Sequence, residues 1–289
     1  MATKISFLFW NIRRALGTRF YESLRHLAWR DIDVFLFAEP AADEHLLLGA
    51  MNGALGGTYY RVPSDSPRLM LFSRLSNATW TDRFSGNLNG RITAHELTVG
   101  DLPSILLIGA HLHSPNTLDD HDRAEWARKL IPQIRRLEDD VGHTRTVLVG
   151  DLNMNPFDRG LVDTTALHAL MSRTLTDSVQ RMKSRRGHLP FYNPMWSLLG
   201  DRVGKDLDQR RAAGTYFHEN SQALASHFWQ MFDQVLVRTD LMKSLTRLEI
   251  LESDGQDWLV SRSGRPRRKA VSDHLPLSFD LTLPDEGVI

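Results

Sequence analysis

Short polar clusters stand at the ends of apolar runs along the whole length of this chain. Apolar runs of about five to eight residues bounded by turn signals are typical of buried strands, so their polar tips can meet at one edge of a sheet. The groups that would meet are carboxylates, amides and imidazoles, an oxygen-rich set suited to a hard divalent cation. The residues at these tips are Asn11, Glu39, His111, Asp151, Asn153, Asp233, Asp273 and His274.

Glu39 is the leading candidate for a metal ligand, because it ends the very apolar run IDVFLFA. An isolated buried carboxylate is costly, so a carboxylate at such a position should be paired or bind a cation. The alternative is an ordinary salt-bridged glutamate at a strand end. Asn11 follows the run KISFLFW and offers a neutral oxygen that could ligate or orient the same ion, although an Asn after a strand is often only a turn residue.

Asp151 and Asn153 belong to the motif GDLN, which follows the apolar run RTVLV. If GDLN continues the strand, both side chains point to the same face, because side chains alternate with a period of two. Together they could then hold one water or one phosphate oxygen. The alternative is an Asx turn that ends the strand, since Pro156 announces a loop.

His274 follows Asp273 and would point away from it in a regular strand, so both can serve one site only if the chain turns there. Pro276 makes such an irregular backbone plausible. Asp233 is the expected partner of His274, because a carboxylate that accepts from one ring nitrogen fixes the tautomer and favours the imidazolium. Whether His274 would act as a base or as a stabilising charge stays open.

This ordered set resembles the endonuclease/exonuclease/phosphatase superfamily, which includes DNase I, abasic-site endonucleases, inositol polyphosphate 5-phosphatases and neutral sphingomyelinases. The resemblance runs from FLFWN to SDHLPL; GDLN or SDH alone would be weak, and their joint order is what is specific. It implies an α+β fold, a four-layer α/β/β/α sandwich of two packed mixed sheets flanked by helices. It also implies Mg²⁺ (or Mn²⁺), with Asp273 contributing to the metal and Asp151 orienting or activating the attacking water.

His111 is similar to a strand-end histidine of that superfamily that contacts the phosphate or assists the leaving group. His113 lies two residues further along in HLHSPN and would share its register, so it competes for the role. We favour His111. A single histidine near a strand end is otherwise more often a structural residue.

Composition sets the wider limits. The 289 residues fit one domain, residues 1–289, in which a stretch of poor periodicity at about 181–227 is expected to be a functional loop excursion. The absence of cysteine excludes disulfides, thiolate catalysis and zinc fingers. Neither a secretory signal nor an apolar run long enough for a membrane span is evident, so we expect a cytoplasmic protein with no membrane association and no obligate protein partner.

Periodicity predicts the main elements. Helices are expected at Thr18–Arg30, Asp119–Asp140 and Thr164–Leu175, with Pro132 causing a kink or a late start in the second, and a Gly-rich region at Gly49–Gly57. Strands are expected at Lys4–Trp10, Ile32–Ala38, Tyr59–Val62, Arg68–Ser73, Ala78–Phe84, Arg91–Leu97, Ile105–Ala110, Thr146–Val149, Gln230–Val237, Ser244–Leu251 and Leu275–Leu283.

The net charge of zero does not indicate nucleic acid by itself, so any basic surface must be local. Two segments supply cations that could neutralise phosphates near the site. They are SRSGRPRRK, with Arg262, Arg265, Arg267, Arg268 and Lys269, and RMKSRR, with Arg181, Lys183, Arg185 and Arg186. Aromatic residues that could stack on bases are Tyr192, Trp196, Tyr216 and Phe217. The alternative is that these are solvated surface loops.

The sequence therefore predicts a Mg²⁺-dependent phosphodiesterase that acts on nucleic acid, with DNA favoured and a DNase I-like endonuclease the leading form. One alternative is an enzyme for inositol phosphates or phospholipid head groups. Against it, Gln234 follows Asp233 where the 5-phosphatases typically carry Arg. An RNase or deadenylase-like activity is a further alternative. The most remote is an inactive binding protein, which would be expected to have lost some of these polar residues.

Overall fold

The strands at the two ends of the chain form one six-stranded sheet. Its order is β14 (Leu245–Ile250), β15 (Leu277–Pro284), β1 (Ala2–Asn11), β2 (Val34–Ala38), β4 (Leu69–Ser73) and β3 (Tyr60–Val62). β1 is parallel to β2 and antiparallel to β15, so the sheet is mixed. The computed structural model describes residues 2–15, 17–40, 43–53, 58–84, 88, 90–183, 189–201, 211–218 and 228–284.

The middle of the chain forms a second, seven-stranded sheet. Its order is β5 (Ala78–Asp82), β6 (Ile92–Val99), β7 (Ile105–His111), β8 (Thr146–Asp151), β13 (Asp233–Val237), β10 (Phe191–Tyr192) and β9 (Ala169–Leu170). β7 and β8 are parallel, whereas β13 runs antiparallel to β8. A separate short hairpin joins β11 (Tyr216–Phe217) to β12 (Trp229–Gln230).

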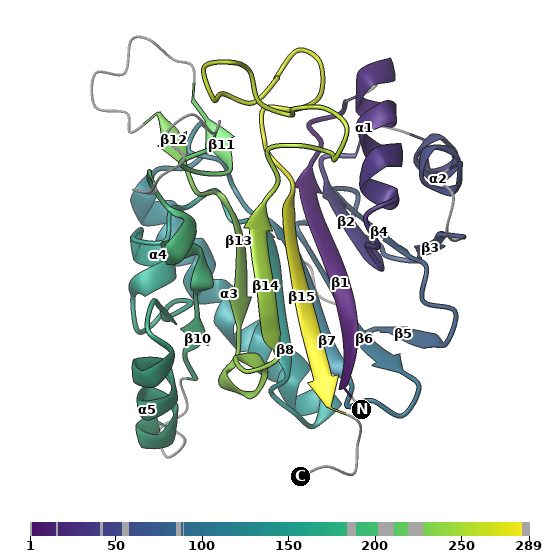
Figure 1. Cartoon of the computed structure of the whole chain (residues 1–289). Helices are drawn as coiled ribbons and strands as arrows, with labels where there is room; N and C mark the ends of the chain where they lie inside the picture. Colours follow the sequence, from purple (N-terminus) through teal and green to yellow (C-terminus); the bar gives the residue numbers. More distant parts are fainter. Residues whose placement is uncertain are drawn as a thin grey trace.

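Strand alternation explains the layers. In β1, Phe7 and Phe9 point between the sheets, whereas Leu8 and Trp10 pack under the helices α1 (Thr18–Ala28) and α2 (Glu44–Asn52). On the outer face of the second sheet, strand side chains such as Ile108 pack against α3 (Asp120–Val141). The three buried clusters are the three interfaces of a four-layer α/β/β/α sandwich, visible in Figure 1, so the predicted fold class is confirmed.

One of the three helices expected from the sequence was wrong. The segment Thr164–Leu175 is not a helix, because β9 pairs with β10 and His168 takes a left-handed φ of 47°. Tertiary pairing there overrides local propensity. The helix begins later, as α5 (Arg173–Lys183).

The helix α2 was missed, since Gly49 argued against it. The Asp43 side chain caps this helix by accepting a hydrogen bond from the His45 N–H at 2.9 Å. Pro132 lies inside α3 without delaying its start. The single strand expected at Gln230–Val237 is divided into β12 and β13.

The carboxyl ends of β1, β2, β7 and β8 lie at one end of the sandwich, where the short helix α4 (Arg159–Val162) and the hairpin β11–β12 also lie (Figure 1). The chain between β14 and β15 forms long loops over this same end. Within the described residues, no helix combines the length and the apolar character needed to cross a bilayer. The polar residues at strand ends are therefore delivered to one rim of the molecule.

Candidate active site

Three of the expected site residues stand in one row of the seven-stranded sheet. Asp151 at the end of β8 is in register with His111 on β7 and with Asp233 on β13. Gly150 allows the close approach of β7, because a Cβ atom at this position would lie 1.9 Å from the carbonyl oxygen of Ala110. The close approach of β7 and β8 that aligns these residues therefore requires glycine at position 150.

The six-stranded sheet brings Asn11 and Glu39 to the same place. Asn11 ends β1 beside Ala38 of the parallel strand β2, and Glu39 follows. The Asn11 Nδ2 donates to Glu39 Oε1 at 3.3 Å and to Asp151 Oδ2 at 2.9 Å. One amide group therefore connects carboxylates from two sheets.

The segment Ser272–His274 is irregular, and two hydrogen bonds hold it against the end of β1. Trp10 Nε1 donates to the carbonyl oxygen of His274 at 2.9 Å, and Ser272 Oγ donates to that of Asn11 at 2.8 Å. As a result Asp273 and His274 both line the same pocket. The turn that the sequence required for these two neighbours is present.

His274 and Asp233 form the expected pair, with Nδ1 donating to Asp233 Oδ2 at 2.8 Å. The other ring nitrogen, Nε2, lies 3.9 Å from Asp151 Oδ2. Burial alone would lower the pKa of His274, but the charges of Asp233, Asp151 and Asp273 outweigh it and raise the pKa to about 10. In the metal-free protein His274 is therefore an imidazolium at neutral pH.

His111 lies between two carboxylates, with Nε2 3.4 Å from Glu39 Oε1 and 3.9 Å from Asp151 Oδ2. Its hydrogen bond lowers the pKa of Glu39 to about 2, against the opposing effect of burial. Burial raises the pKa of Asp151, and the nearby charge of His274 opposes that rise. The pKa of Glu39 is therefore lowered and the pKa of Asp151 is raised, although both carboxylates line the same pocket.

The structure separates the two competing histidines. His111 lines the pocket, whereas the ring of His113 packs against Trp126 with 5.6 Å between centroids. His111 is therefore the histidine that stands with the carboxylates.

Asn153 reconciles the two interpretations of GDLN. β8 ends at Asp151, whose Oδ1 accepts from the Asn153 N–H at 3.0 Å, so the motif does form an Asx turn. The Asn153 amide donates to the carbonyl oxygen of Leu112 at 3.2 Å, and both Asp151 and Asn153 still line the pocket. The shared face comes from a turn and not from strand periodicity.

Several of the strained backbone positions of the described residues lie at these strand ends. Arg13, Glu39 and Asn153 have φ angles of 43°, 50° and 51°, a region that residues other than glycine rarely adopt. Such conformations persist only where the surrounding structure enforces them, and they cluster at functional sites. The strain supports a functional assignment of this rim.

The pocket has a volume of about 660 Å³, and it contains a cation that the sequence argument missed. Arg13 places its Nη1 2.9 Å from Asp273 Oδ2, and Arg268 Nε lies 3.8 Å from the same oxygen. The only signal in the sequence was the pair of arginines directly after Trp-Asn-Ile. Besides Arg13 and Arg268, the lining residues include Glu39, His111, Asp151, Asn153, Tyr216, Asp273 and His274.

A divalent cation fits the carboxylates of this pocket. Both arginines reach Asp273 Oδ2, whereas Asp273 Oδ1 is buried and has no hydrogen-bond partner among the described residues. Glu39 adds a second carboxylate. The Asn11 oxygen accepts from the Arg13 N–H at 3.0 Å, so in this arrangement Asn11 orients the carboxylates through its NH₂ group.

Asp151, Asp233 and His274 form another group compact enough for a metal, with ligand atoms within 4.8 Å of one another. Asp233 Oδ2 accepts a hydrogen bond from His274 Nδ1, whereas Asp233 Oδ1, like Asp273 Oδ1, is buried and has no hydrogen-bond partner among the described residues. We favour Glu39 and Asp273 as the site of the cation, because a cation on Asp233 Oδ2 and His274 Nδ1 would have to break the hydrogen bond between them.

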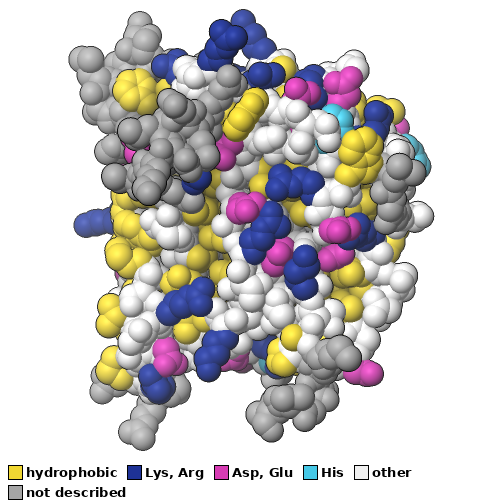
Figure 2. All heavy atoms as spheres, viewed as in Figure 1, with side chains coloured by type: hydrophobic (Ala, Val, Ile, Leu, Met, Phe, Trp, Pro, Cys, Tyr) yellow, Lys and Arg dark blue, Asp and Glu magenta, His cyan; other side chains and the backbone are white. Residues whose placement is uncertain are grey.

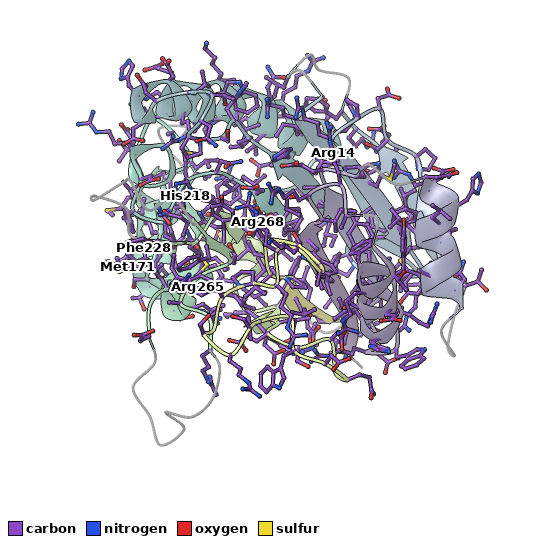
Figure 3. All side chains as sticks on the ribbon, turned by 90° about the horizontal axis from the view of Figure 1, so that it is seen from above. Arg14, Met171, His218, Phe228, Arg265 and Arg268 are labelled. Atoms are coloured by element: carbon purple, nitrogen blue, oxygen red, sulfur yellow. The ribbon has the colours of Figure 1, made fainter. Side chains whose placement is uncertain are left out.

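The loop Arg262–Lys269 lies beside the pocket, as expected. Arg268 lines it, and the Arg265 guanidinium stacks over the ring of Phe217 at 4.5 Å. Figure 3 shows Arg265, Arg268 and His218 together in the view onto this end, and Figure 2 shows Lys and Arg side chains gathered along the same rim. A local basic surface thus exists in a protein of zero net charge.

The RMKSRR segment does not support the expectation that it lies beside the site. Arg181 is on α5, which Figure 1 shows at the end of the sandwich opposite to β11 and β12. Arg185 and Arg186, and the side chain of Lys183, lie outside the described residues. Arg181 is close in sequence to the predicted loop excursion, but α5 runs back along the second sheet and places Arg181 away from the site.

The four aromatic residues also divide. Tyr216 stacks on Phe232 in the pocket, with 5.5 Å between centroids, and Phe217 packs under Arg265. Tyr192 is instead part of β10, and Trp196 contacts Phe157. Only Tyr216 of the four lines the pocket.

The charge state of His274 gives a direct prediction. In metal-free protein, NMR titration of the His274 ring should give a pKa of about 10. Asp233→Asn should lower this pKa, because it removes the hydrogen-bonded carboxylate. A wild-type value near 6.5 would show that burial, and not the carboxylates, dominates this ring.

Comparison with known proteins agrees with the geometry. The model of the Endonuclease/Exonuclease/phosphatase family matches residues 8–274. A family member from Bacteroides thetaiotaomicron is 16% identical at a TM-score of 0.58, covering 99% of this chain and all of that one. D. rerio TDP2 complexed with a single-strand DNA product is 14% identical at 0.55, covering 98% and 99%. The 3′ phosphatase NExo from Neisseria, bound to a product DNA hairpin, is 16% identical at 0.54, covering 96% and 99%.

These solved structures, at such low identity, show the fold alone. A search of curated protein sequences gave no match. The family match, in contrast, spans nearly the whole chain and includes Asn11 and every residue that lines the pocket, from Arg13 to His274. The chain belongs to the endonuclease/exonuclease/phosphatase family and is a metal-dependent phosphoesterase.

Proposed function

We propose that this protein is a Mg²⁺-dependent phosphodiesterase that hydrolyses nucleic acid, with DNA the favoured substrate and internal cleavage the favoured mode. The observation that carries the proposal is the convergence of Glu39, His111, Asp151, Asp273 and His274 from two sheets into one pocket. These are the groups that phosphodiester hydrolysis needs to neutralise the phosphate, handle a water and stabilise the leaving oxygen.

Glu39 and Asp273 would hold the cation, and Asn11 would fix the position of Glu39. The low pKa of Glu39 supports this role, because the carboxylate is ionised over the whole physiological range. When bound, the cation supplies positive charge for the phosphate. Mn²⁺ has similar ligand preferences and could replace Mg²⁺.

Asp151 would orient the attacking water and accept its proton. It is buried, and its raised pKa makes its carboxylate a better proton acceptor than an exposed aspartate. Asn153 would help to hold the same water, since both residues line the pocket on one Asx turn.

His274 would stabilise the transition state with the proton on Nε2. Asp233 binds Nδ1 and keeps the ring oriented, so Nε2 is the nitrogen free to face the phosphate. The high pKa favours a role as a charge or proton donor over a role as base. His111, beside Glu39 and Asp151, would act on the phosphate or the leaving group.

The rim supports a polyanionic substrate with bases. Arg13 and Arg268 line the pocket as cations, and Tyr216 adds an aromatic ring to the same wall, where it packs against Phe232 and His274. D. rerio TDP2 and Neisseria NExo, which share the fold, are seen with DNA products. TRAS1, another protein of this fold, supplies an endonuclease domain.

A substrate panel tests the proposal. Purified protein should cleave supercoiled plasmid or single-stranded DNA in Mg²⁺, and EDTA should abolish the cleavage, because the cation is needed to neutralise the phosphate. RNA and inositol phosphates complete the panel. Hydrolysis of only the inositol compounds, or nuclease activity that survives EDTA, would contradict the proposal.

A further inference from the structure

We propose that Phe157 is the stacking platform of a second subsite, which binds an unpaired nucleobase next to the scissile phosphate. This inference rests on the proposed function and adds a substrate preference to it. Single-stranded or locally unpaired nucleic acid would be preferred over continuous duplex, because a base within a duplex offers no free face to the platform.

The subsite is a second hollow that opens from the first. Its volume is about 410 Å³, and it lies between the start of α3 and the turn before α4. The two hollows share four lining residues, so they form one continuous groove. The shared residues are Asp120, Arg123, Phe157 and Asp158.

Phe157 is held in this groove by a rigid turn. The Asn155 N–H donates to Asp158 Oδ2 at 2.8 Å, and the Asp158 N–H donates back to the carbonyl oxygen of Asn155 at 2.9 Å. The Asn155 side chain is fixed in turn by Gln230 and by the Met231 N–H. Because Pro156 also restricts φ, the backbone that carries Phe157 is ordered before any ligand arrives.

The exposure of this ring needs a reason. Phe157 leaves 44% of its surface open at the junction of the two hollows, on a turn whose neighbour Asn155 is almost fully buried. Its ring contacts Trp196 with 6.4 Å between centroids, so part of the ring surface packs against the protein. An exposed aromatic ring on a preorganised turn, inside a polar groove, is a low-entropy contact surface for another planar group.

The charges around Phe157 favour a base over a second phosphate. Arg123 is almost fully buried, and its guanidinium donates to Asp120 Oδ1 and to the carbonyl oxygen of Leu118. Arg159 adds a second cation to the wall, and Asp120 and Asp158 add two carboxylates. A wall of balanced charge attracts a polyanion weakly, whereas carboxylates accept hydrogen bonds from the amino and imino groups of bases.

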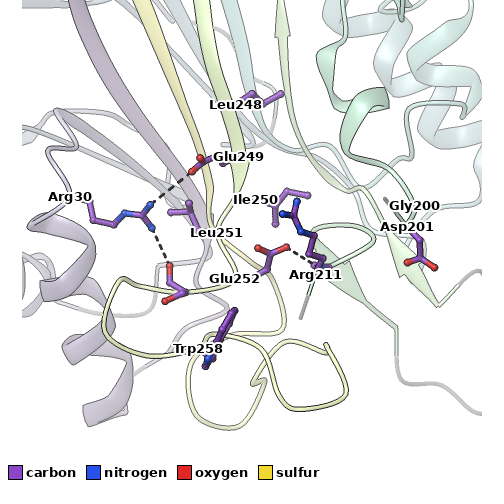
Figure 4. Close-up of a pocket in the computed structure, with 12 residues that line it drawn as sticks. Arg30, Gly200, Asp201, Arg211, Leu248, Glu249, Ile250, Leu251, Glu252 and Trp258 are labelled. Atoms are coloured by element: carbon purple, nitrogen blue, oxygen red, sulfur yellow. Dashed lines mark hydrogen bonds and ion pairs between the residues drawn. The ribbon is translucent and has the colours of Figure 1, made fainter. Parts of the chain in front are cut away.

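Trp258 provides a matched control elsewhere on the surface. It is exposed to 42%, close to the value for Phe157, but it lines a separate pocket of about 310 Å³ with Arg30 and Glu249 (Figure 4). None of the catalytic residues named above lines that pocket. Trp258→Ala therefore measures the effect of losing an exposed aromatic ring in general, and comparison with Phe157→Ala isolates the effect of losing Phe157.

The test compares the wild type, Phe157→Ala, Phe157→Trp and Trp258→Ala on a single-stranded DNA oligonucleotide. A second oligonucleotide of equal length carries an abasic tetrahydrofuran residue at every position, so it has the phosphates but no bases. On the base-bearing strand, Phe157→Ala should lower kcat/KM by about 10-fold, which is the usual scale for one stacked base. Phe157→Trp should restore most of the loss, and Trp258→Ala should behave as wild type.

On the abasic strand the difference between wild type and Phe157→Ala should shrink towards zero. An equal loss on both strands, or no loss on the base-bearing strand, would overturn the inference. Binding gives a readout independent of turnover: a 2-aminopurine oligonucleotide in Ca²⁺ should be quenched by wild type and not by Phe157→Ala.

The two proposals can fail separately. Quenching that depends on Phe157 without any cleavage of nucleic acid would contradict the proposed nuclease and leave the subsite standing. Cleavage of DNA with no quenching, or with quenching unchanged in Phe157→Ala, would contradict the subsite and leave the nuclease standing.

Discussion

Replacing Asp151 with asparagine is expected to lower kcat for phosphodiester hydrolysis by at least about 10³-fold. The asparagine keeps the shape and can still accept from the Asn11 amide, but it cannot take a proton from water. Steady-state kinetics on a single oligonucleotide would measure the loss. Retained wild-type turnover in a purified, folded Asp151→Asn protein would remove Asp151 from the mechanism.

The fold should survive this substitution. Because burial raises the pKa of Asp151, its ionised form weakens folding at every pH above the ordinary range of an aspartate. A neutral amide removes that cost, so the melting temperature of Asp151→Asn should equal or exceed that of wild type. The pair of outcomes, lost turnover and kept stability, is what a functional buried carboxylate predicts.

Asp254 is the matched control for a buried carboxylate. It is almost fully buried but lies outside the pocket, where it binds Arg19 at 2.8 Å. Burial opposes its ionisation, yet the backbone N–H groups of Asp257 and Gln256 and the charge of Arg19 outweigh it and lower its pKa. Its charge therefore stabilises folding above the ordinary pKa of aspartate, so Asp254→Asn should lower the melting temperature while turnover of the folded protein is kept.

Replacing His274 with alanine is expected to lower kcat by about 10²- to 10⁴-fold, the usual range for a positioned proton-transfer group. The loss should be larger than that of Asp233→Asn, because Asp233 acts through the ring of His274. The double variant should be little worse than His274→Ala alone, since the two residues form one unit.

His113→Ala is the control for a histidine close in sequence. Its ring packs on Trp126 and does not line the pocket, so its loss should leave the catalytic step intact. If His274→Ala and Asp233→Asn instead showed fully additive losses, the two side chains would not be working as the pair that their 2.8 Å contact indicates.

The parts of the site that depend on the ends and the register of the strands could be predicted from the sequence. Apolar runs that end in a polar residue deliver that residue to one rim, and the register of β7, β8 and β13 then aligns His111, Asp151 and Asp233. Amphipathic periodicity was equally informative for α1 and α3, because a helix that covers a sheet must bury one face.

Other features depend on contacts that no local pattern encodes. Arg13 reaches Asp273 only because β1 and the Ser272–His274 segment meet in space. α5 carries Arg181 away from the site because it lies in the connection between the paired strands β9 and β10, at the end of the sandwich opposite to β11 and β12. Phe157 has a weak signal in Asn-Pro-Phe-Asp, a turn sequence, but its exposure and the groove beside it appear only after folding.

The most direct test of the account is a crystal of this protein soaked in Mn²⁺, with anomalous scattering used to locate the ion. We predict a peak coordinated by the carboxylates of Glu39 and Asp273, with the Arg13 side chain moved away from Asp273. A peak on Asp233 and His274, or no peak within the pocket at a concentration that supports activity, would contradict the account.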